Sequence, residues 1–224
     1  MKPSELIVML TYNDCTVENA AEIFEACVDA PARYWGFKEK PLPLEQMQAL
    51  YARMRGASKT TVLEVVEYEE DACLAGARMA VACECDILMG TTYHDSVLEL
   101  CAENDIKYMP FIGVVSQRPS VLEGTAELML EQLESYARKG VYGVDLLGYR
   151  HIGDAEKVMA EVLAQSPLPV CLAGSVDSYQ KLDFIKANKP WAFTIGSAFF
   201  DGKFGGSFSE QIAAVGNHLH GSRG

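Results

Sequence analysis

The stretch LPVCLAGSVDSYQKLDFIKANKPWAFTIGSAFFDGKFG, residues 168–205, contains two apolar runs that each stop at a Gly-Ser pair. The first pair is Gly174-Ser175 and the second is Gly196-Ser197, with about one helix of sequence between them. An apolar run, a helix and a second apolar run are typical of a β-strand alternating with an α-helix. The same alternation recurs along the rest of the chain.

Eight strand-like stretches, rich in apolar and β-branched residues, are each followed by a segment with helical spacing of apolar residues. The strands are expected at 6–12, 33–38, 60–68, 85–90, 106–115, 141–149, 168–174 and 192–200. The helices are expected near 17–28, 44–56, 70–84, 95–103, 120–138, 154–165, 177–188 and 208–219. Asp154 and Asp177 are the expected N-caps of two of these helices.

The length of the chain decides between the folds that such alternation permits. Strands that alternate with helices favour right-handed crossovers and a parallel sheet. Eight units in 224 residues fit a compact barrel better than a doubly wound sheet. We therefore expect an α/β fold, a single (β/α)8 TIM barrel, with residues 1–224 forming one domain.

Composition excludes several classes of function. The formal net charge of −12 repels phosphate backbones and anionic membranes, so we expect neither nucleic acid nor a membrane as partner. No apolar run is long enough to span a bilayer, and the N-terminal run is too short for a signal peptide. Seven cysteines without C-x-x-C spacing predict a reduced, cytoplasmic protein. Homo-oligomerisation remains open.

The two Gly-Ser pairs predict a phosphate site. In this fold the functional site lies at the carboxyl ends of the strands, and a phosphate site often follows strands seven and eight. Glycine lets the backbone approach an anion, and the amide groups and hydroxyls that follow donate to phosphate oxygens. We expect Gly174, Ser175, Gly196 and Ser197 to hold a phosphorylated small molecule. The alternative is that each Gly-Ser merely ends a strand.

The segment from LAGSV to DGKF resembles the last two units of the ribulose-phosphate-binding barrels, among them the histidine-biosynthesis ribonucleotide isomerase and phosphoribosylanthranilate isomerase. Those enzymes have an Ala/Ser-Gly-Gly-Val turn, a helix, and then Val-Gly-Ser/Lys-Ala-Leu with a trailing Gly-Lys/Arg-Phe. The resemblance covers about 35 residues, and Ser175 replaces the second glycine of the first turn. It implies the barrel fold, a phosphorylated substrate and isomerase or related chemistry.

Reactive side chains are expected at the other strand ends. Asp14 follows the first strand and is either a general base or the cap of a helix starting at Thr16. Lys38 ends the second strand and is either an acid, electrophile or imine-forming amine, or a solvated surface lysine. The aldolases of this fold that form a Schiff base commonly carry lysine on strand six, where this chain has none, which argues against membership of that group.

Two carboxylates lie on the third expected strand. Glu64 sits between Leu63 and Val65, whereas Glu67 lies nearer the carboxyl end, where catalytic groups gather. Glu67 is therefore the expected base. A carboxylate buried in this strand needs a partner, and Lys38 on the adjacent strand is the expected one. The alternative is an ion pair that serves the scaffold alone.

Histidine and aspartate complete the set of candidates. His94 follows the fourth strand and is a candidate proton shuttle. Glu67 with His94 offers two ligands to a divalent metal, which is weak evidence, so no cofactor and no metal site are predicted, and a divalent metal is kept as an alternative. Asp145 on the sixth strand is a candidate base that points into the barrel mouth, and Arg150 after it either reaches the ligand or is a loop charge.

Together these residues predict an enzyme that acts on a phosphorylated sugar or sugar acid by acid–base chemistry beside a carbonyl. An isomerase or epimerase is expected first, and a carbon–carbon lyase, meaning an aldolase or decarboxylase, second. The alternatives are a barrel that senses a phosphorylated metabolite without catalysis, and a barrel that works only with a partner subunit.

Overall fold

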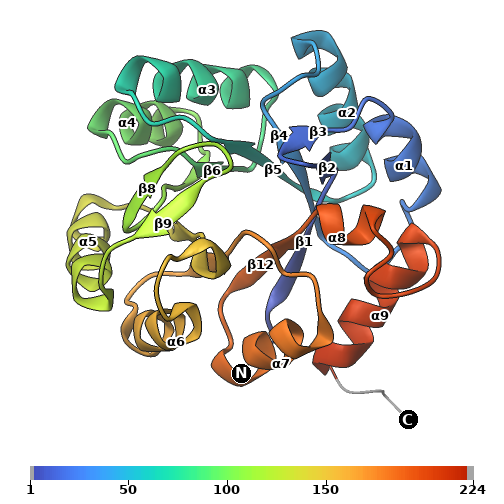
Figure 1. The fold of residues 1–224 in the computed structure, drawn as a ribbon. Helices are drawn as coiled ribbons and strands as arrows, with labels where there is room; N and C mark the ends of the chain where they lie inside the picture. The colour runs from blue at the N-terminus through green and yellow to red at the C-terminus, as the bar shows by residue number, and fades with distance from the viewer. Residues whose placement is uncertain (1–2, 221–224) are drawn as a thin grey trace.

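In the computed structural model, which describes residues 3–220, eight parallel strands form a barrel that is surrounded by helices (Figure 1). The single (β/α)8 TIM barrel expected from the sequence is thus confirmed. The predicted domain 1–224 also includes residues 1–2 and 221–224, which lie outside the described residues. No helix within 3–220 combines the length and the apolar character that crossing a membrane requires.

The barrel strands follow the expected order. They are β1 (Glu5–Met9), β4 (Tyr34–Lys38), β5 (Thr60–Val65), β6 (Ile87–Gly90), β7 (Lys107–Met109), β10 (Val144–Leu146), β11 (Val170–Leu172) and β12 (Ala192–Ile195). The helices are α1 (Ala20–Ala26), α2 (Leu44–Gly56), α3 (Glu70–Ala82), α4 (Asp95–Glu103), α5 (Ala126–Lys139), α6 (Ala155–Gln165), α7 (Tyr179–Asn188), α8 (Ser197–Phe200) and α9 (Phe208–His220). A 3₁₀ turn, η1 (Gly148–Arg150), follows β10.

Parallel pairing runs in the order β10, β11, β12, β1, β4, β5, β6, β7. The seam between β7 and β10 is closed just past the end of β7, where Phe111 and Asp145 form a parallel bridge. The amide of Asp145 donates to the carbonyl of Pro110 at 2.9 Å. The fifth strand is therefore shorter than the predicted 106–115, because the chain leaves the barrel soon after this bridge.

Two apolar cores follow from the two-residue period of the strands. The outer core lies between strands and helices and includes Trp35, Phe37 and Leu63. The inner core fills the barrel and consists of Ile7, Met9, Val62, Ile87, Met89, Met109, Cys171 and Ala192. Flexible methionine side chains fill an irregular interior well. The cavity described below lies at the carboxyl end of the strands, and Met9 belongs both to this inner core and to the cavity wall.

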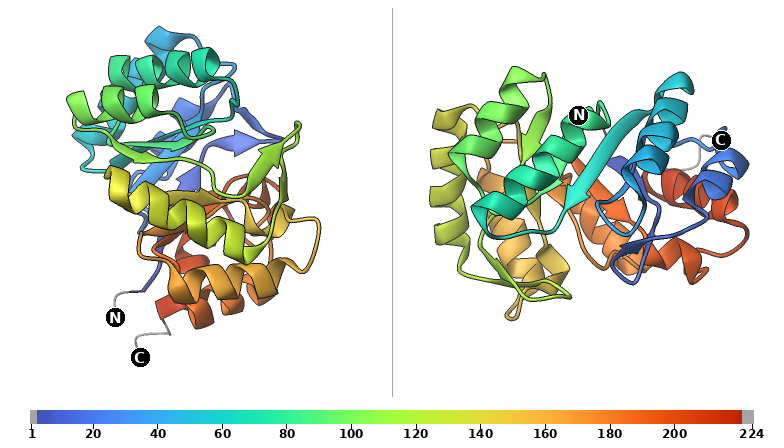
Figure 2. Two further views of the ribbon diagram at one scale, coloured as in Figure 1. Left: turned by 90° about the vertical axis from the view of Figure 1, so that its left-hand side faces the viewer. Right: turned by 90° about the horizontal axis from the view of Figure 1, so that it is seen from above.

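Two antiparallel hairpins were not expected from the sequence. β2 (Thr11–Tyr12) pairs with β3 (Cys15–Thr16), and β8 (Val114–Ser116) pairs with β9 (Val121–Glu123). The second hairpin stands out from one end of the barrel (Figure 2). Because residues 121–123 belong to β9, the helix expected from residue 120 begins only at Ala126.

The helix ends partly match the sequence. Asp154 is the N-cap of α6, as expected, and its side chain accepts from the amide of Lys157 at 3.2 Å. The prediction for Asp177 is wrong, because Ser178 caps α7 by accepting from the amide of Lys181.

Candidate functional site

A cavity of about 190 Å³ opens at the carboxyl ends of the barrel strands. Its walls come from the ends of six strands and from the β8–β9 hairpin, so it is the place where this fold brings distant segments together. The lining residues are Met9, Thr11, Asp14, Lys38, Glu64, Ser120, Leu147, Arg150, Gly174, Ser175, Val176, Asp177, Thr194, Gly196, Ser197, Ala198 and Asp201.

Both Gly-Ser turns line this cavity, and neither glycine leaves room for a side chain. At Gly174, where φ is +81°, an added Cβ would lie 3.0 Å from Nε of Arg150. At Gly196 it would lie 2.6 Å from Oγ1 of Thr11. A left-handed or crowded backbone of this kind favours glycine. The turns therefore present backbone rather than side chain at one wall of the cavity.

Amide hydrogens are free on this wall. Within residues 3–220, the N–H groups of Ser175, Val176, Ser197 and Ala198 have no acceptor in the protein. Because these residues line the cavity, their unpaired N–H groups are available to an anion bound there. The hydroxyl of Ser197 accepts from the amide of Asn13 at 3.1 Å, which leaves its own hydrogen free to donate.

Two carboxylates also border this wall, at Asp177 and Asp201. The charge of Asp177 is offset by Lys181, whose Nζ lies 2.9 Å from Oδ1 of Asp177. The same ammonium donates to the carbonyl of Ser175 at 2.6 Å. Lys181 thus reduces the repulsion that an incoming anion would meet at the first turn.

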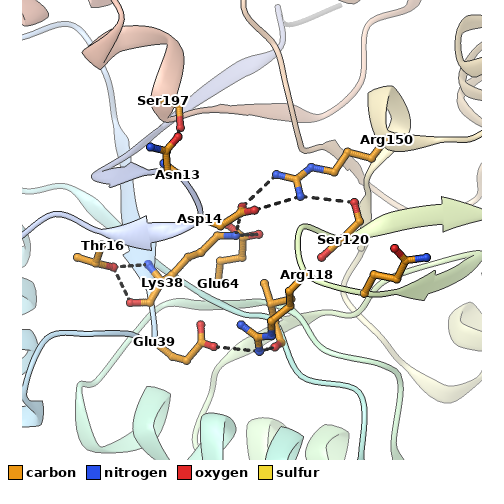
Figure 3. Close-up of polar contacts among 12 residues, drawn as sticks. Asn13, Asp14, Thr16, Lys38, Glu39, Glu64, Arg118, Ser120, Arg150 and Ser197 are labelled. Atoms are coloured by element: carbon orange, nitrogen blue, oxygen red, sulfur yellow. Dashed lines mark hydrogen bonds and ion pairs between the residues drawn. The ribbon is translucent and has the colours of Figure 1, made fainter.

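Lys38 lies between two carboxylates at the opposite wall (Figure 3). Its Nζ is 2.9 Å from Oδ1 of Asp14 and 3.4 Å from Oε1 of Glu64. The side chains of Lys38 and Glu64 are only 10% and 9% exposed. Thr16 fixes the backbone of Lys38, because its Oγ1 accepts from the Lys38 amide at 2.9 Å and donates to the Lys38 carbonyl at 2.8 Å.

The protonation of this cluster follows from its contacts. Burial alone lowers the pKa of Lys38, but the negative charges of Glu64 and Asp14 and the hydrogen bond to Asp14 more than offset it, so the pKa of Lys38 is raised. Burial raises the pKa of Asp14, but hydrogen bonds and charges from Arg150 and Lys38 bring that pKa down to about 2. Lys38 is therefore a cation and Asp14 an anion at neutral pH.

Arg150 is part of the same cluster. Its Nη2 lies 3.0 Å from Oδ1 of Asp14, and its Nη1 lies 3.4 Å from Oδ2. Nη1 also donates to the carbonyl of Ser120 at 3.5 Å, and the aliphatic stem packs against Gly174. Arg150 is therefore not a free loop charge. Asp14 does not cap a helix either, because α1 begins at Ala20 and residues 15–16 form β3.

Of the two glutamates expected on the third strand, Glu64 rather than Glu67 faces the cavity. Glu64 lies opposite Lys38 in the β4–β5 register and faces the cavity, whereas its neighbours Leu63 and Val65 belong to the outer core. Glu67 lies two residues beyond the end of β5 and does not line the cavity.

The glutamate of this strand that pairs with Lys38 is Glu64, and not Glu67, the expected base. Glu67 instead lies 2.8 Å from Nζ of Lys40 and 3.0 Å from Nη2 of Arg118. The flanking apolar residues of Glu64 already indicated a partly apolar environment, and its inward orientation follows from the two-residue period once the register is known.

Asp145 lies inside the barrel below the cavity lining. It is fully buried, and neither carboxylate oxygen has a hydrogen-bond partner among the described residues. Burial, with the charge of Glu64 adding to it, raises the pKa of Asp145 well above its ordinary value. Its neighbour across the sheet is Cys171. Burial without a hydrogen-bond partner therefore favours the protonated form of Asp145.

His94 lies apart from the cavity. It immediately precedes α4, and its Nε2 is 3.2 Å from the carbonyl of Tyr68. Within residues 3–220, no group of three or more His, Cys, Asp or Glu side chains is arranged to hold a metal ion.

A second chamber of about 280 Å³ adjoins the first on the side of Arg118, and its lining shares Asp14, Lys38 and Ser120 with the first. Arg118 comes from the β8–β9 loop and lies 3.7 Å from Oε1 of the buried Glu39 (Figure 3). The sequence pattern did not single out Arg118 or Ser120, because nothing local predicts that this hairpin folds over the mouth.

No protein-family model and no curated protein matches the chain. Solved structures with a similar fold include a 4-hydroxy-2-oxoglutarate/2-dehydro-3-deoxyphosphogluconate aldolase, with 14% identity, a TM-score of 0.66, and 97% of this chain and 95% of that chain covered. An N-acetylmannosamine-6-phosphate 2-epimerase from Clostridium perfringens has 12% identity, a TM-score of 0.64 and coverage of 93% and 90%. A phosphoribosyl anthranilate isomerase has 13% identity, a TM-score of 0.63 and coverage of 97% and 99%. These similarities show that the chain shares its barrel fold with these enzymes.

Proposed function

We propose that this protein is an enzyme that binds a phosphorylated sugar or sugar acid and moves a proton on the carbon beside its carbonyl group. One observation carries the proposal: a single cavity has free amide hydrogens of two glycine turns on one wall and the Lys38–Glu64 pair on the other. An isomerase or epimerase agrees best with this arrangement. The structural neighbours include an epimerase and an isomerase named for phosphorylated compounds, which supports the same class.

The phosphate is proposed to bind at Gly174, Ser175, Gly196 and Ser197. Up to four amide groups and two hydroxyls are available there to the oxygens of a dianion. Backbone donors suit a protein with a net charge of −12, since they bind an anion without adding a fixed positive charge.

Glu64 is proposed as the base. It removes the proton from the carbon beside the carbonyl, and the electron pair of the broken C–H bond forms a carbon–carbon double bond while the carbonyl oxygen becomes negative. The ammonium of Lys38 donates a hydrogen bond to this oxygen and stabilises its charge. If the hydroxyl group on the deprotonated carbon passes its proton to the negative oxygen, and the former carbonyl carbon takes up the proton from Glu64, the product is an isomer with the carbonyl moved by one carbon. Return of a proton to the opposite face of the same carbon re-forms the original carbonyl and gives an epimer.

Asp145 is proposed as the proton donor for the return step. Burial, with the charge of Glu64 adding to it, raises its pKa well above the ordinary value and so favours the protonated form that a proton donor needs. Asp14, with a pKa of about 2, is a poor base, so we assign it no proton transfer. Glu67 and His94 are not part of this proposal, because Glu67 pairs with Lys40 and Arg118 and His94 contacts the carbonyl of Tyr68. No cofactor is invoked.

The experiment is proton exchange in heavy water. The protein is incubated with a panel of ketose and aldose phosphates, and NMR follows loss of the hydrogen beside the carbonyl. We expect exchange with at least one compound, a loss of roughly 100-fold or more in Glu64→Gln, and little change in the matched control Glu67→Gln. Exchange that persists in Glu64→Gln would show that another group is the base.

Binding is measured on the same panel by thermal shift. Ser197→Glu places a carboxylate beside the proposed phosphate position and should abolish the stabilisation by every phosphorylated compound. Unchanged binding in this variant contradicts the phosphate site. If phosphorylated compounds stabilise the parent protein but no proton exchange occurs, the result favours a barrel that senses a phosphorylated metabolite without catalysis.

A further inference from the structure

We propose that Arg150 and Lys38 together recognise a carboxylate group on the phosphorylated ligand, and that Asp14 occupies this position until the ligand displaces it. This assignment rests on the proposed phosphate site and narrows the substrate class to phosphorylated sugar acids.

The side chain of Asp14 is bound as a ligand carboxylate would be. Its Oδ1 receives hydrogen bonds from Nζ of Lys38 at 2.9 Å and from Nη2 of Arg150 at 3.0 Å. Its Oδ2 receives a longer one from Nη1 of Arg150 at 3.4 Å. Two parallel N–H groups of one guanidinium on the two oxygens of one carboxylate form a fork, which discriminates carboxylates by shape and charge. Figure 3 shows the Asp14 carboxylate between the two cations.

Both cations border the same cavity as the glycine turns. The stem of Arg150 packs over Gly174, with Cγ and Nε within about 3 Å of where a Cβ would stand. Lys38 and Arg150 are therefore reached from the cavity that holds the free amides of Ser175 and Ser197. One ligand can reach both anion-binding elements if it carries acidic groups at its two ends.

Asp14 has room to leave. Its side chain is 34% exposed, in contrast to the buried Lys38 and Glu64. It lies in the tight turn between β2 and β3, where Asn13 and Asp14 both have positive φ, of 49° and 62°. Asp14 also borders the open mouth outside the cavity, so a side-chain rotation toward solvent is enough to vacate the position.

Displacement by a carboxylate conserves the charge balance of the cluster. When a ligand carboxylate replaces Asp14, Lys38 and Arg150 keep an anionic partner, and Asp14 gains full hydration at the mouth. A hydroxyl group in the same place would leave two partly buried cations with a weaker acceptor. The site should therefore select an acid over the corresponding alcohol.

The test compares 6-phosphogluconate with glucitol 6-phosphate by isothermal titration calorimetry. The two compounds differ only at carbon 1, which is a carboxylate in the first and a hydroxymethyl group in the second, and neither has an aldehyde or ketone group. We expect the acid to bind roughly 10- to 100-fold more tightly, as for a charge-assisted hydrogen-bonded pair. Arg150→Gln should remove most of this ratio, whereas Arg53→Gln, which breaks an outer pair with Glu25, should not.

The Asp14→Asn variant distinguishes a carboxylate that the ligand displaces from one that only holds Lys38 and Arg150 in place. If Asp14 competes with the ligand, this variant binds 6-phosphogluconate about tenfold more tightly than the parent protein, because the position is no longer filled by an anion. Weaker binding of the acid in Asp14→Asn, or equal affinities of the parent protein for the two compounds, overturns the proposal.

Binding of inorganic phosphate distinguishes failure of the carboxylate assignment from failure of the proposed function. If phosphate binds in a manner that Ser197→Glu abolishes while the acid and the alcohol bind equally, only the carboxylate assignment falls. If neither phosphate nor either sugar compound binds, the phosphate site is wrong, and the carboxylate assignment falls with it.

Discussion

Replacing Lys38 by methionine should destabilise the barrel through the carboxylate that it leaves behind. Methionine keeps most of the length and volume of the side chain but removes the ammonium 3.4 Å from Oε1 of Glu64. Asp14 keeps Arg150 as a partner, whereas Glu64 faces the barrel interior beside the buried Asp145. The penalty therefore falls mainly on Glu64.

Removing one partner of a buried pair costs about 3–5 kcal/mol, and the 9% exposure of the Glu64 side chain brings it into this class. We expect about 3 kcal/mol, near the lower end, because water in the cavity reaches part of the carboxylate. For a protein of this size this corresponds to a fall in melting temperature of roughly 6–12 °C. Urea denaturation and calorimetry measure both quantities.

A double-mutant cycle tests the reason for the loss. Glu64→Gln alone leaves Lys38 with Asp14 and should cost about 1 kcal/mol. In the double variant the uncompensated charge is gone, so its loss should be about 1–3 kcal/mol smaller than the sum of the single losses. Lys40→Met is the matched control, because Lys40 is 62% exposed and its pair with Glu67 contributes less than about 1 kcal/mol. A loss below about 1 kcal/mol in Lys38→Met, or strictly additive losses, would refute the reasoning.

Three further outcomes follow from the same contacts. The pKa of Asp14 is lowered from 3.8 to about 2, so its stabilising contribution is complete above pH 4 and is lost as the pH falls through 2. This contribution to the free energy of unfolding is about 1 kcal/mol after solvent screening. The Asp14→Asn variant should lack it, which a comparison of the acid unfolding of the two proteins measures. Because the raised pKa keeps Lys38 protonated, borohydride with 2-keto acids should trap no adduct at neutral pH, and mass spectrometry showing an adduct on Lys38 would favour a lyase instead. Of the seven free cysteines only Cys15 is exposed, so Ellman's reagent should find one fast thiol in the native protein, none in Cys15→Ser, and seven in urea; several fast thiols would contradict the packing of the buried ones.

The barrel could be predicted from the sequence because its evidence is local. Apolar runs and helical spacing recur within short windows, and eight such units in one chain of this length leave little choice of architecture. The positions of Gly174 and Gly196 after strands seven and eight follow from the same count. The hairpins β2–β3 and β8–β9 could not be predicted from the sequence pattern, because their strands have only two or three residues each.

The candidate site was predicted less completely. Lys38 and Asp14 were found from their places at strand ends, but their contact joins positions 24 residues apart, and the contact of Asp14 with Arg150 joins positions 136 apart. Glu67 was preferred to Glu64 because it lies nearer the carboxyl end of the strand. The register opposite Lys38 selects Glu64 instead, and a pattern within one strand carries no information about that register.

The alternation of strands and helices, the number of units and the strand ends that carry polar residues can be read from the amino-acid sequence, because each of these depends on neighbours along the chain. Which charged side chains form pairs depends on the tertiary structure. Closure of the barrel brings Asp14, Lys38 and Arg150 around one point, and the two-residue period turns Glu64 toward that point while Glu67 is left outside. Pairing of charges depends on distance through space, and that distance exists only once the strands are in register and the ring is closed.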